Sequence, residues 1–277
     1  MNATVFCIVL FAAALHASWN AIVKRGGDTL LTTILVTGSA ALIAAVGLPF
    51  LPPPSVESWP FIAASSLFQI AYFVLVARTY RIADMSLTYP MMRGTAPLLV
   101  ALASLVLIGE PLSQSAWLGV GIICAGILSM AGAARSGNRA GVALALGNAV
   151  VIAGYTLIDG IGVRRSGAAA AYTLWIFLLT GVVLVGWALF RRRAGILSYA
   201  GRNWAFGLLG GTGTIGSYGL ALWAMTVAPV AVVAALRETS ILFGVAIAAL
   251  ILREKVGLAK IIGVCVIAVG AGALRLS

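Results

Sequence analysis

The stretch Tyr89-Pro90-Met91-Met92-Arg93-Gly94-Thr95-Ala96-Pro97 opens a long apolar run, Met85 to Gly126, that decides the fold. A faint second copy of this run lies 144 positions further along the chain, and no gap is needed to align the two. The aligned identical pairs are Arg93/Arg237, Thr95/Thr239, Leu98/Leu242, Glu110/Glu254, Gly119/Gly263, Val120/Val264, Ile123/Ile267 and Gly126/Gly270. A period of this length is too long for a solenoid, so it indicates a duplicated half-protein.

The composition places the chain in a membrane. Of its 277 residues, 62% are hydrophobic and 9% are charged, whereas about a quarter of the residues in a soluble domain are charged. The formal net charge of +11 does not indicate a nucleic-acid partner, because a phosphate-binding surface gathers its lysines and arginines on one polar face. Here the basic residues punctuate apolar runs, so we expect membrane lipid as the surroundings and no nucleic acid.

The pattern predicts an all-α integral membrane protein with ten transmembrane helices, arranged as two inverted five-helix repeats around a central cavity. A helical span needs about 20 mostly apolar residues. Ten such spans fit, at 3–24, 28–50, 57–77, 85–108, 114–134, 140–163, 168–190, 203–226, 230–252 and 256–275. Five spans per half is an odd number, so the halves, expected at 1–137 and 138–277, have opposite orientations. The glycine-rich span at 203–226 predicts close helix packing.

Basic residues are distributed unevenly between the two sides of this arrangement. One side holds Arg164, Arg165 and Arg275. The other side holds thirteen, which are Lys24, Arg25, Arg78, Arg81, Arg135, Arg139, Arg191, Arg192, Arg193, Arg202, Arg253, Lys255 and Lys260. Such an excess marks the cytoplasmic face, so we expect both termini outside a bacterial inner membrane and a cytoplasmic loop at 191–193.

Metal and cofactor chemistry finds little support in the sequence. The three cysteines, Cys7, Cys124 and Cys265, lie in apolar runs without metal-ligand or CxxC spacing. His16 is the only histidine. An enzyme would need a clustered nucleophile, base or metal set. We therefore expect no metal, no cofactor and no enzymatic activity.

Three features of the chain resemble the drug/metabolite transporter superfamily, EamA type. They are His16-Ala17-Ser18-Trp19-Asn20 followed by Lys24, the tail of the fourth span from Pro97 to Gly109-Glu110, and the duplicated 5+5 layout. The resemblance covers nearly the whole chain. The superfamily contains amino-acid and metabolite exporters, nucleotide-sugar and triose-phosphate carriers, and small multidrug pumps.

The resemblance implies a central cavity lined by the first, third, fourth, sixth, eighth and ninth spans. The fifth and tenth spans would be peripheral supports. One feature departs from the family pattern: its members usually have cytoplasmic termini, whereas the charge distribution here predicts termini outside.

Four charged residues inside spans are candidates for function, because charge at such depth usually faces a cavity or a partner. Arg93 and Arg237 have two interpretations, contact with a substrate anion or an internal ion pair. Glu238 is the natural partner of Arg93. A buried carboxyl group can also exchange protons near neutral pH, so Glu238 and Asp159 are candidates for proton coupling.

Aromatic and polar residues recur on the expected cavity spans. Tyrosine and tryptophan combine an apolar body with a polar tip, which suits aromatic or mixed solutes, and core packing is the alternative. His16 is a candidate both for binding and for pH gating. The predicted substrate-binding set is His16, Trp19, Asn20, Tyr72, Tyr89, Arg93, Tyr155, Trp175, Tyr218, Trp223 and Arg237.

The favoured function is a secondary transporter that exports small metabolites by alternating access, with amino acids, aromatic ones among them, as the best candidates. A small multidrug or organic-cation exporter is the first alternative. A membrane-embedded enzyme or receptor is the second. We expect a small-molecule solute as the partner and a monomer as the assembly, with a homodimer as the alternative.

Overall fold

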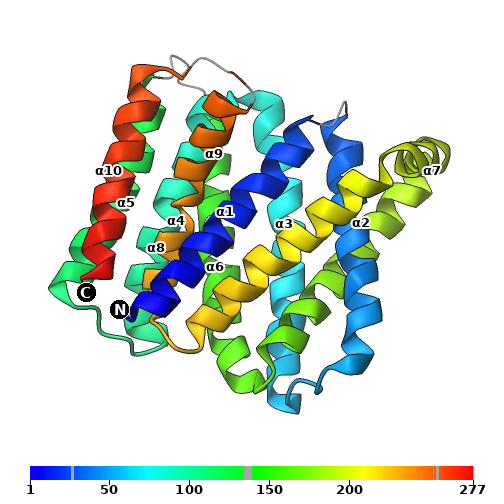
Figure 1. The fold of residues 1–277 in the computed structure, drawn as a ribbon, viewed down its shortest axis with the longest axis horizontal. Coiled ribbons are helices and arrows are strands. Elements are labelled where there is room, and N and C mark those ends of the chain that lie inside the picture. The colour runs from blue at the N-terminus through cyan, green and yellow to red at the C-terminus, as the bar shows by residue number, and fades with distance from the viewer. Residues whose placement is uncertain (26–27, 134–138, 252, 254–255, 277) are drawn as a thin grey trace.

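The computed structural model describes residues 1–25, 28–133, 139–251, 253 and 256–276, and every regular element in those residues is a helix. Figure 1 shows the helices side by side in one bundle. Short 3₁₀ turns occur at Leu48–Phe50, Val56–Ser58 and Met130–Ala133. The α-helices are α1 (Ala3–Arg25), α2 (Thr29–Gly47), α3 (Trp59–Ile82), α4 (Met85–Leu107), α5 (Gln114–Ser129), α6 (Arg139–Ser166), α7 (Ala169–Met225), α8 (Val230–Arg237), α9 (Ser240–Leu250) and α10 (Leu258–Arg275).

These helices provide the ten expected membrane crossings. In the described part of the chain, eight stretches are long and apolar enough to span a membrane, and α8 with α9 count as one of them. The 16-residue α5 is a shorter apolar helix. The 57 residues of α7 would extend about 85 Å if straight, but in Figure 1 α7 turns back on itself and forms two legs. The second leg and α5 complete the ten.

The turn between the two legs of α7 corrects one prediction. The sequence predicted a loop at 191–193, but the backbone stays helical through these positions. Arginine and alanine are strong helix formers, so the run from Arg191 to Ala194 favours helix over loop. The side chain of Arg191 is exposed there.

The helices exchange partners between the two halves, α1–α5 and α6–α10. The first helix of each half packs on the fourth span of the other half, because α1 contacts α8 and α9 while α6 contacts α4. Likewise α1 contacts α7 and α6 contacts α3, the third span of the opposite half. An inverted repeat requires this reciprocal pattern, so the predicted fold class is confirmed.

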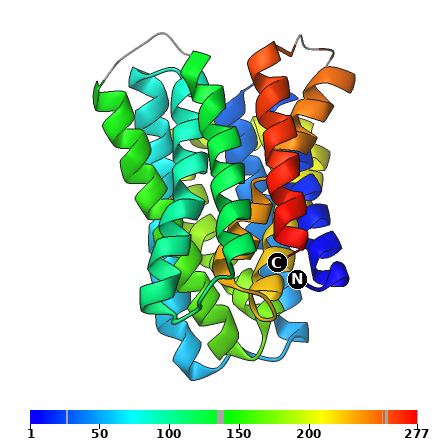
Figure 2. The ribbon, with the colours of Figure 1, turned by 90° about the vertical axis from the view of Figure 1, so that its left-hand side faces the viewer.

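The fifth and tenth spans, α5 and α10, pack closely through four glycines at the edge of the bundle (Figures 1 and 2). A Cβ atom on Gly263 would lie 2.8 Å from the Gly126 carbonyl oxygen, and one on Gly270 would lie 3.0 Å from the Gly119 carbonyl oxygen. Small residues allow membrane helices to approach this closely. Gly126 therefore meets Gly263, the repeat counterpart of Gly119, and Gly119 meets Gly270, the repeat counterpart of Gly126.

Glycines on the second leg of α7 have the same role at a second interface. A Cβ on Gly207 would lie 2.6 Å from Leu35 Cγ, and one on Gly211 would lie 2.9 Å from the Ala40 amide nitrogen. Both neighbours belong to α2. The predicted close packing of this glycine-rich span is confirmed.

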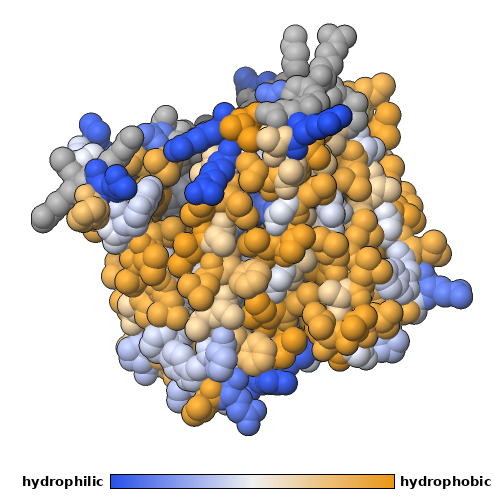
Figure 3. Space-filling view, turned by 180° about the vertical axis from the view of Figure 1, so that it is seen from behind, coloured by the Kyte–Doolittle hydropathy of each residue, from blue (hydrophilic) through white to orange (hydrophobic). Residues whose placement is uncertain are grey.

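The two termini lie on the same face of the bundle (Figure 2). Arg275 Nη1 donates a 2.7 Å hydrogen bond to the Met1 carbonyl oxygen, which ties the ends together. Figure 3 shows apolar side chains over the middle of the visible surface and hydrophilic ones chiefly toward its two ends. This distribution is the one that a lipid bilayer requires of a spanning bundle.

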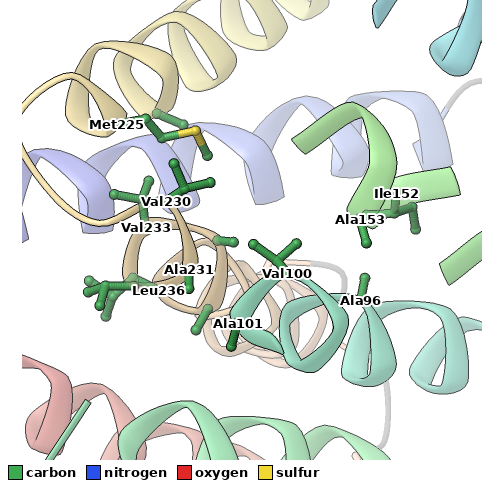
Figure 4. Close-up of a cluster of buried hydrophobic side chains, with 14 of the residues drawn as sticks. Ala96, Val100, Ala101, Ile152, Ala153, Met225, Val230, Ala231, Val233 and Leu236 are labelled. Carbon is green, nitrogen blue, oxygen red and sulfur yellow. The ribbon is translucent and has the colours of Figure 1, made fainter. Parts of the chain in front are cut away.

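The centre of the bundle is a buried apolar cluster around α8 (Figure 4). Every residue from Val230 to Leu236 is buried, and a helix that is apolar all round is one that other helices surround. Val100 of α4 and Ile152 of α6 pack in the same cluster. The arrangement places the polar residues at the end of α8 in the middle of the protein.

Candidate functional site

An ion pair joins the two halves at the centre of the molecule. Arg93 Nε on α4 lies 2.8 Å from Glu238 Oε2, which follows α8, and their side chains are 8% and 6% exposed. The two atoms are close but not aligned as a hydrogen bond. Isolated buried charges are strongly unfavourable, so each of the two stabilises the other in place. The structure thus contains the internal pair that the sequence offered as one interpretation of Arg93.

Glu238 lies at an interruption that the sequence did not predict. The span expected at 230–252 is present as Val230–Leu250, but its helix is interrupted, because α8 ends at Arg237 and α9 begins at Ser240. Between them the backbone makes tighter bonds: the Ile241 N–H donates to the Glu238 carbonyl oxygen at 3.0 Å, the i to i−3 spacing of a 3₁₀ turn. The Thr239 hydroxyl donates to the Leu236 carbonyl oxygen at 2.6 Å, a local bond that competes with regular helix.

At the interruption, the neighbouring residues Arg237 and Glu238 have different partners. The Arg237 guanidinium carbon lies 4.8 Å from the centre of the Tyr218 ring, above its face. This cation–π contact is attractive, more so away from water. No acidic side chain of the described residues lies within ion-pair distance of Arg237. Arg237 is therefore a cation whose charge is not balanced by a direct partner there.

A second buried carboxylate lies on the other side of Tyr218. Asp159 on α6 is fully buried. Its Oδ1 accepts a 3.0 Å hydrogen bond from the Tyr172 hydroxyl, and its Oδ2 accepts a short one from the Tyr218 hydroxyl. Asp159 therefore links α6 to both legs of α7.

Three tyrosines continue from this carboxylate across the bundle. The Tyr155 and Tyr218 ring centres are 6.5 Å apart, and those of Tyr72 and Tyr155 are 6.3 Å apart. Both contacts are edge-to-face, a favourable geometry for aromatic pairs. The structure thus brings Tyr72, Tyr155 and Tyr218, predicted from three different spans, into one row.

A small pocket of about 10 Å³, the space of a single water molecule, lies between α4, α6 and α8, next to this row. It combines both central arginines and Glu238 with aromatic and apolar walls. Its lining residues are Arg93, Ala96, Pro97, Val100, Ile152, Tyr155, Thr156, Ala234, Arg237 and Glu238. Small-molecule sites combine apolar walls with a few convergent polar groups in the same way.

The predicted residues of α1 lie apart from the lining of this pocket. The rings of His16 and Trp19 meet edge-to-face with their centres 5.3 Å apart. The Asn20 amide donates to the His16 carbonyl oxygen at 2.7 Å, and its side chain is otherwise exposed. The Trp19 indole nitrogen is buried and has no hydrogen-bond partner among the described residues. His16 and Trp19 thus form a pair of their own.

Two predicted tryptophans do not reach the pocket. Trp223 is 39% exposed and is not among the residues that line this pocket. Trp175 packs against Trp59 with ring centres 4.8 Å apart. Tyr89 precedes Arg93 by four residues on α4 and so shares its face of the helix.

A polar cluster on the terminus face was missed. Glu110 Oε1 lies 2.5 Å from Arg164 Nη1, and Glu110 Oε2 accepts a 3.0 Å hydrogen bond from the Val230 N–H at the start of α8. Arg164 also donates to the carbonyl oxygens of Met225 at 2.6 Å and Ala228 at 3.0 Å. The sequence signal was present, since Glu110 is one of the repeated residues. Its counterpart Glu254 lies outside the described residues.

Tyr172 was also missed; it lies in the first turn of α7, just beyond the end of the helix that carries Asp159. Within the described residues, no group of three or more His, Cys, Asp or Glu side chains could hold a metal ion.

Comparison with known proteins identifies the architecture. No curated protein matches the chain significantly. A solved structure titled "Crystal structure of protein" is similar to it with a TM-score of 0.79 and 17% sequence identity, and the match covers 100% of this chain and 98% of that one. A likeness at this identity shows the shared fold alone. The model of the EamA-like transporter family matches residues 3–132 and again residues 139–275, two matches that together span nearly the whole sequence. The chain therefore belongs to the EamA-like transporter family.

Proposed function

We propose that this protein is a secondary transporter of the bacterial inner membrane that exports small metabolites, with amino acids as the best candidates. Membership of a drug/metabolite-type transporter family gives the general activity, and it is consistent with a protein that is not an enzyme. The proposal of amino acids rests on one observation, the Arg237 guanidinium on the wall of the pocket without an acidic partner among the described residues.

The charges that line the pocket favour a substrate that carries a carboxylate. Arg93 and Glu238 balance one another at 2.8 Å, so Arg237 leaves the lining with an excess positive charge. An arginine holds a carboxylate by two parallel charge-assisted hydrogen bonds. The same excess repels an organic cation, which argues against the multidrug alternative.

The aromatic row suits the remainder of such a solute. Tyr155 lines the pocket, and its ring packs between those of Tyr72 and Tyr218. Aromatic faces bind apolar or aromatic side chains. An amino acid with a large apolar side chain therefore matches both parts of the site. The pocket holds only about 10 Å³ in this arrangement, so it has to widen when it binds such a solute.

Alternating access is the proposed mechanism, and the terminus face is the closed one in this arrangement. The contacts of Glu110 and Arg164 join the segment after α4 to the end of α6 and to the segment between α7 and α8. Opening of the pocket toward this face requires those contacts to part. Glu238, Asp159 and His16 are the proposed coupling groups; a proton on Glu238 would remove the charge that holds Arg93.

The test is transport by purified protein in proteoliposomes, with a panel of amino acids, sugar phosphates and organic cations, with and without a pH gradient. We expect amino acids to be transported and Arg237→Gln to reduce that transport. The control is Arg165→Gln, which removes an equal charge from an exposed residue above Phe61. Transport of organic cations alone would favour the multidrug alternative, and normal amino-acid transport by Arg237→Gln would refute the proposed site.

A further inference from the structure

We propose that Asp159 sets the carboxylate preference of the pocket indirectly, by holding the Tyr218 ring beneath the Arg237 guanidinium. This inference rests on the proposed function, in which Arg237 binds the substrate carboxylate. Asp159 is not itself one of the residues that line the pocket. It is a positioning residue, and its effect reaches the substrate through Tyr218 and then through Arg237.

The first link is the hydrogen bond between Tyr218 and Asp159. The Tyr218 hydroxyl donates to Asp159 Oδ2, and both residues are buried. A buried hydroxyl has no water to replace such a partner, so loss of the bond leaves an unsatisfied polar group. The bond therefore fixes the outer end of the ring.

The second link anchors Asp159 from the opposite side. Its Oδ1 accepts a hydrogen bond from the Tyr172 hydroxyl at 3.0 Å. The Tyr172 hydroxyl is itself confined, since a Cβ on Gly162 would lie only 2.3 Å from it. Tyr172 therefore holds the carboxylate from the first leg of α7.

The third link is the stack of Arg237 on Tyr218, 4.8 Å from the ring centre. Stacking uses the flat face of a guanidinium, whereas its N–H donors lie in its plane. The donors thus stay available for a carboxylate while the ring fixes the plane in which they point. Phe177 and Tyr155 support Tyr218 at its sides, with ring centres 6.1 Å and 6.5 Å away.

Two separate contacts keep the Tyr218 ring in the core and set its orientation. Packing against Phe177 and Tyr155 keeps the ring in the core even without its hydroxyl. The hydrogen bond to Asp159 adds the orientation that Arg237 needs. Loss of that bond should therefore weaken recognition of the carboxylate more than it weakens the fold.

The experiment compares uptake of L-phenylalanine and L-phenylalaninamide, which lacks the carboxylate charge, in proteoliposomes. We expect Asp159→Asn and Tyr218→Phe each to raise the half-saturation concentration for L-phenylalanine by about tenfold with little change in maximal rate, since an arginine bound out of plane loses its paired bonds. Uptake of the amide should change little. The matched control is Tyr172→Phe, which removes the other hydrogen bond to Asp159 and leaves the one from Tyr218, and it should have a smaller effect.

A double-mutant cycle provides the decisive comparison. In an Arg237→Gln background, Asp159→Asn should have no further effect on L-phenylalanine, because nothing is left to position. Additive effects, or equal losses for acid and amide, would overturn the inference. If Asp159→Asn fails to fold, Tyr218→Phe, which keeps the ring and the carboxylate, carries the same test. Failure of the proposed function has a different signature, unchanged uptake by Arg237→Gln alone or no uptake of L-phenylalanine by the wild-type protein.

Discussion

Glu110 and Arg164 belong to different halves of the chain, yet Glu110 Oε1 and Arg164 Nη1 lie 2.5 Å apart. The pair is partly exposed, at 19% and 28% of the two side chains. Both side chains also bond backbone groups, Glu110 the Val230 N–H and Arg164 the Ala228 carbonyl oxygen. It joins three segments of the chain on the terminus face.

Weakening this pair should open the pocket toward the terminus face. We expect Glu110→Gln or Arg164→Gln to speed labelling of a cysteine at Thr156, a lining residue, by about fivefold, the ratio that loss of about 1 kcal/mol gives for a partly exposed pair. The reagent is an impermeant thiol reagent added from the terminus side, after Cys7, Cys124 and Cys265 have been replaced.

The control for that measurement is Arg165→Gln, which changes the neighbouring arginine without touching Glu110. Arg165 lies over the Phe61 ring instead. Faster labelling from the opposite face, or an equal effect of Arg165→Gln, would contradict the role of the pair.

Removal of one partner of the central ion pair should destabilise the protein strongly. Arg93→Gln leaves Glu238 buried without its cation, a change that typically costs about 3–5 kcal/mol. The measurement is thermal unfolding in detergent, followed by size-exclusion chromatography. The double variant Arg93→Gln/Glu238→Gln removes both charges and should recover most of the loss. A double variant as unstable as Arg93→Gln would show that the unpaired charge of Glu238 is not the cause of the lost stability.

The α5–α10 interface should be sensitive to a single methyl group. Gly263→Ala places a Cβ 2.8 Å from the Gly126 carbonyl oxygen, and overpacking of this kind typically costs about 1–3 kcal/mol. Gly121→Ala and Gly272→Ala lie on the same two helices with open space around them, so they should be neutral or slightly stabilising. Equal melting temperatures for all three variants would argue against a tight interface.

Sidedness of the membrane can be checked independently of transport. The uneven basic residues predict that both termini lie outside. A cysteine at Ser277, in a protein without its native cysteines, should react with an impermeant thiol reagent in intact cells. Reaction only after lysis would reverse the orientation and agree with the usual family pattern.

The ten spans and the internal duplication could be predicted because both depend on properties that lie along the sequence. Length and apolar content define a membrane helix, and repeated residues such as Gly119 and Gly263 give the alignment of the halves. The ion pair of Arg93 with Glu238 could also be predicted, since charges at that depth require a partner.

The face of each helix could not be predicted, and Tyr218 and Trp223 show why. Both are aromatic residues on the second leg of α7, five positions apart, but Tyr218 is buried and Trp223 is 39% exposed. In a soluble protein, polar residues mark the outer face of a helix. In a membrane, lipid accepts apolar side chains as readily as the core does, so the sequence gives no comparable signal.

The interruption at Glu238 was missed for a related reason. The apolar run continues on both sides of Arg237-Glu238-Thr239-Ser240, and neither proline nor glycine lies at the break itself. It depends on tertiary contacts, because Arg93 and Tyr218 draw two neighbouring side chains to different places.

The reciprocal glycine contacts of α5 and α10 have a consequence for assembly. Gly126 meets Gly263, the counterpart of Gly119, and Gly119 meets Gly270, the counterpart of Gly126. A single copy of α5 therefore carries both sides of this interface. Two identical five-span chains, inserted in opposite orientations, could form the same seam, so the covalent link between the halves joins surfaces that are already self-complementary.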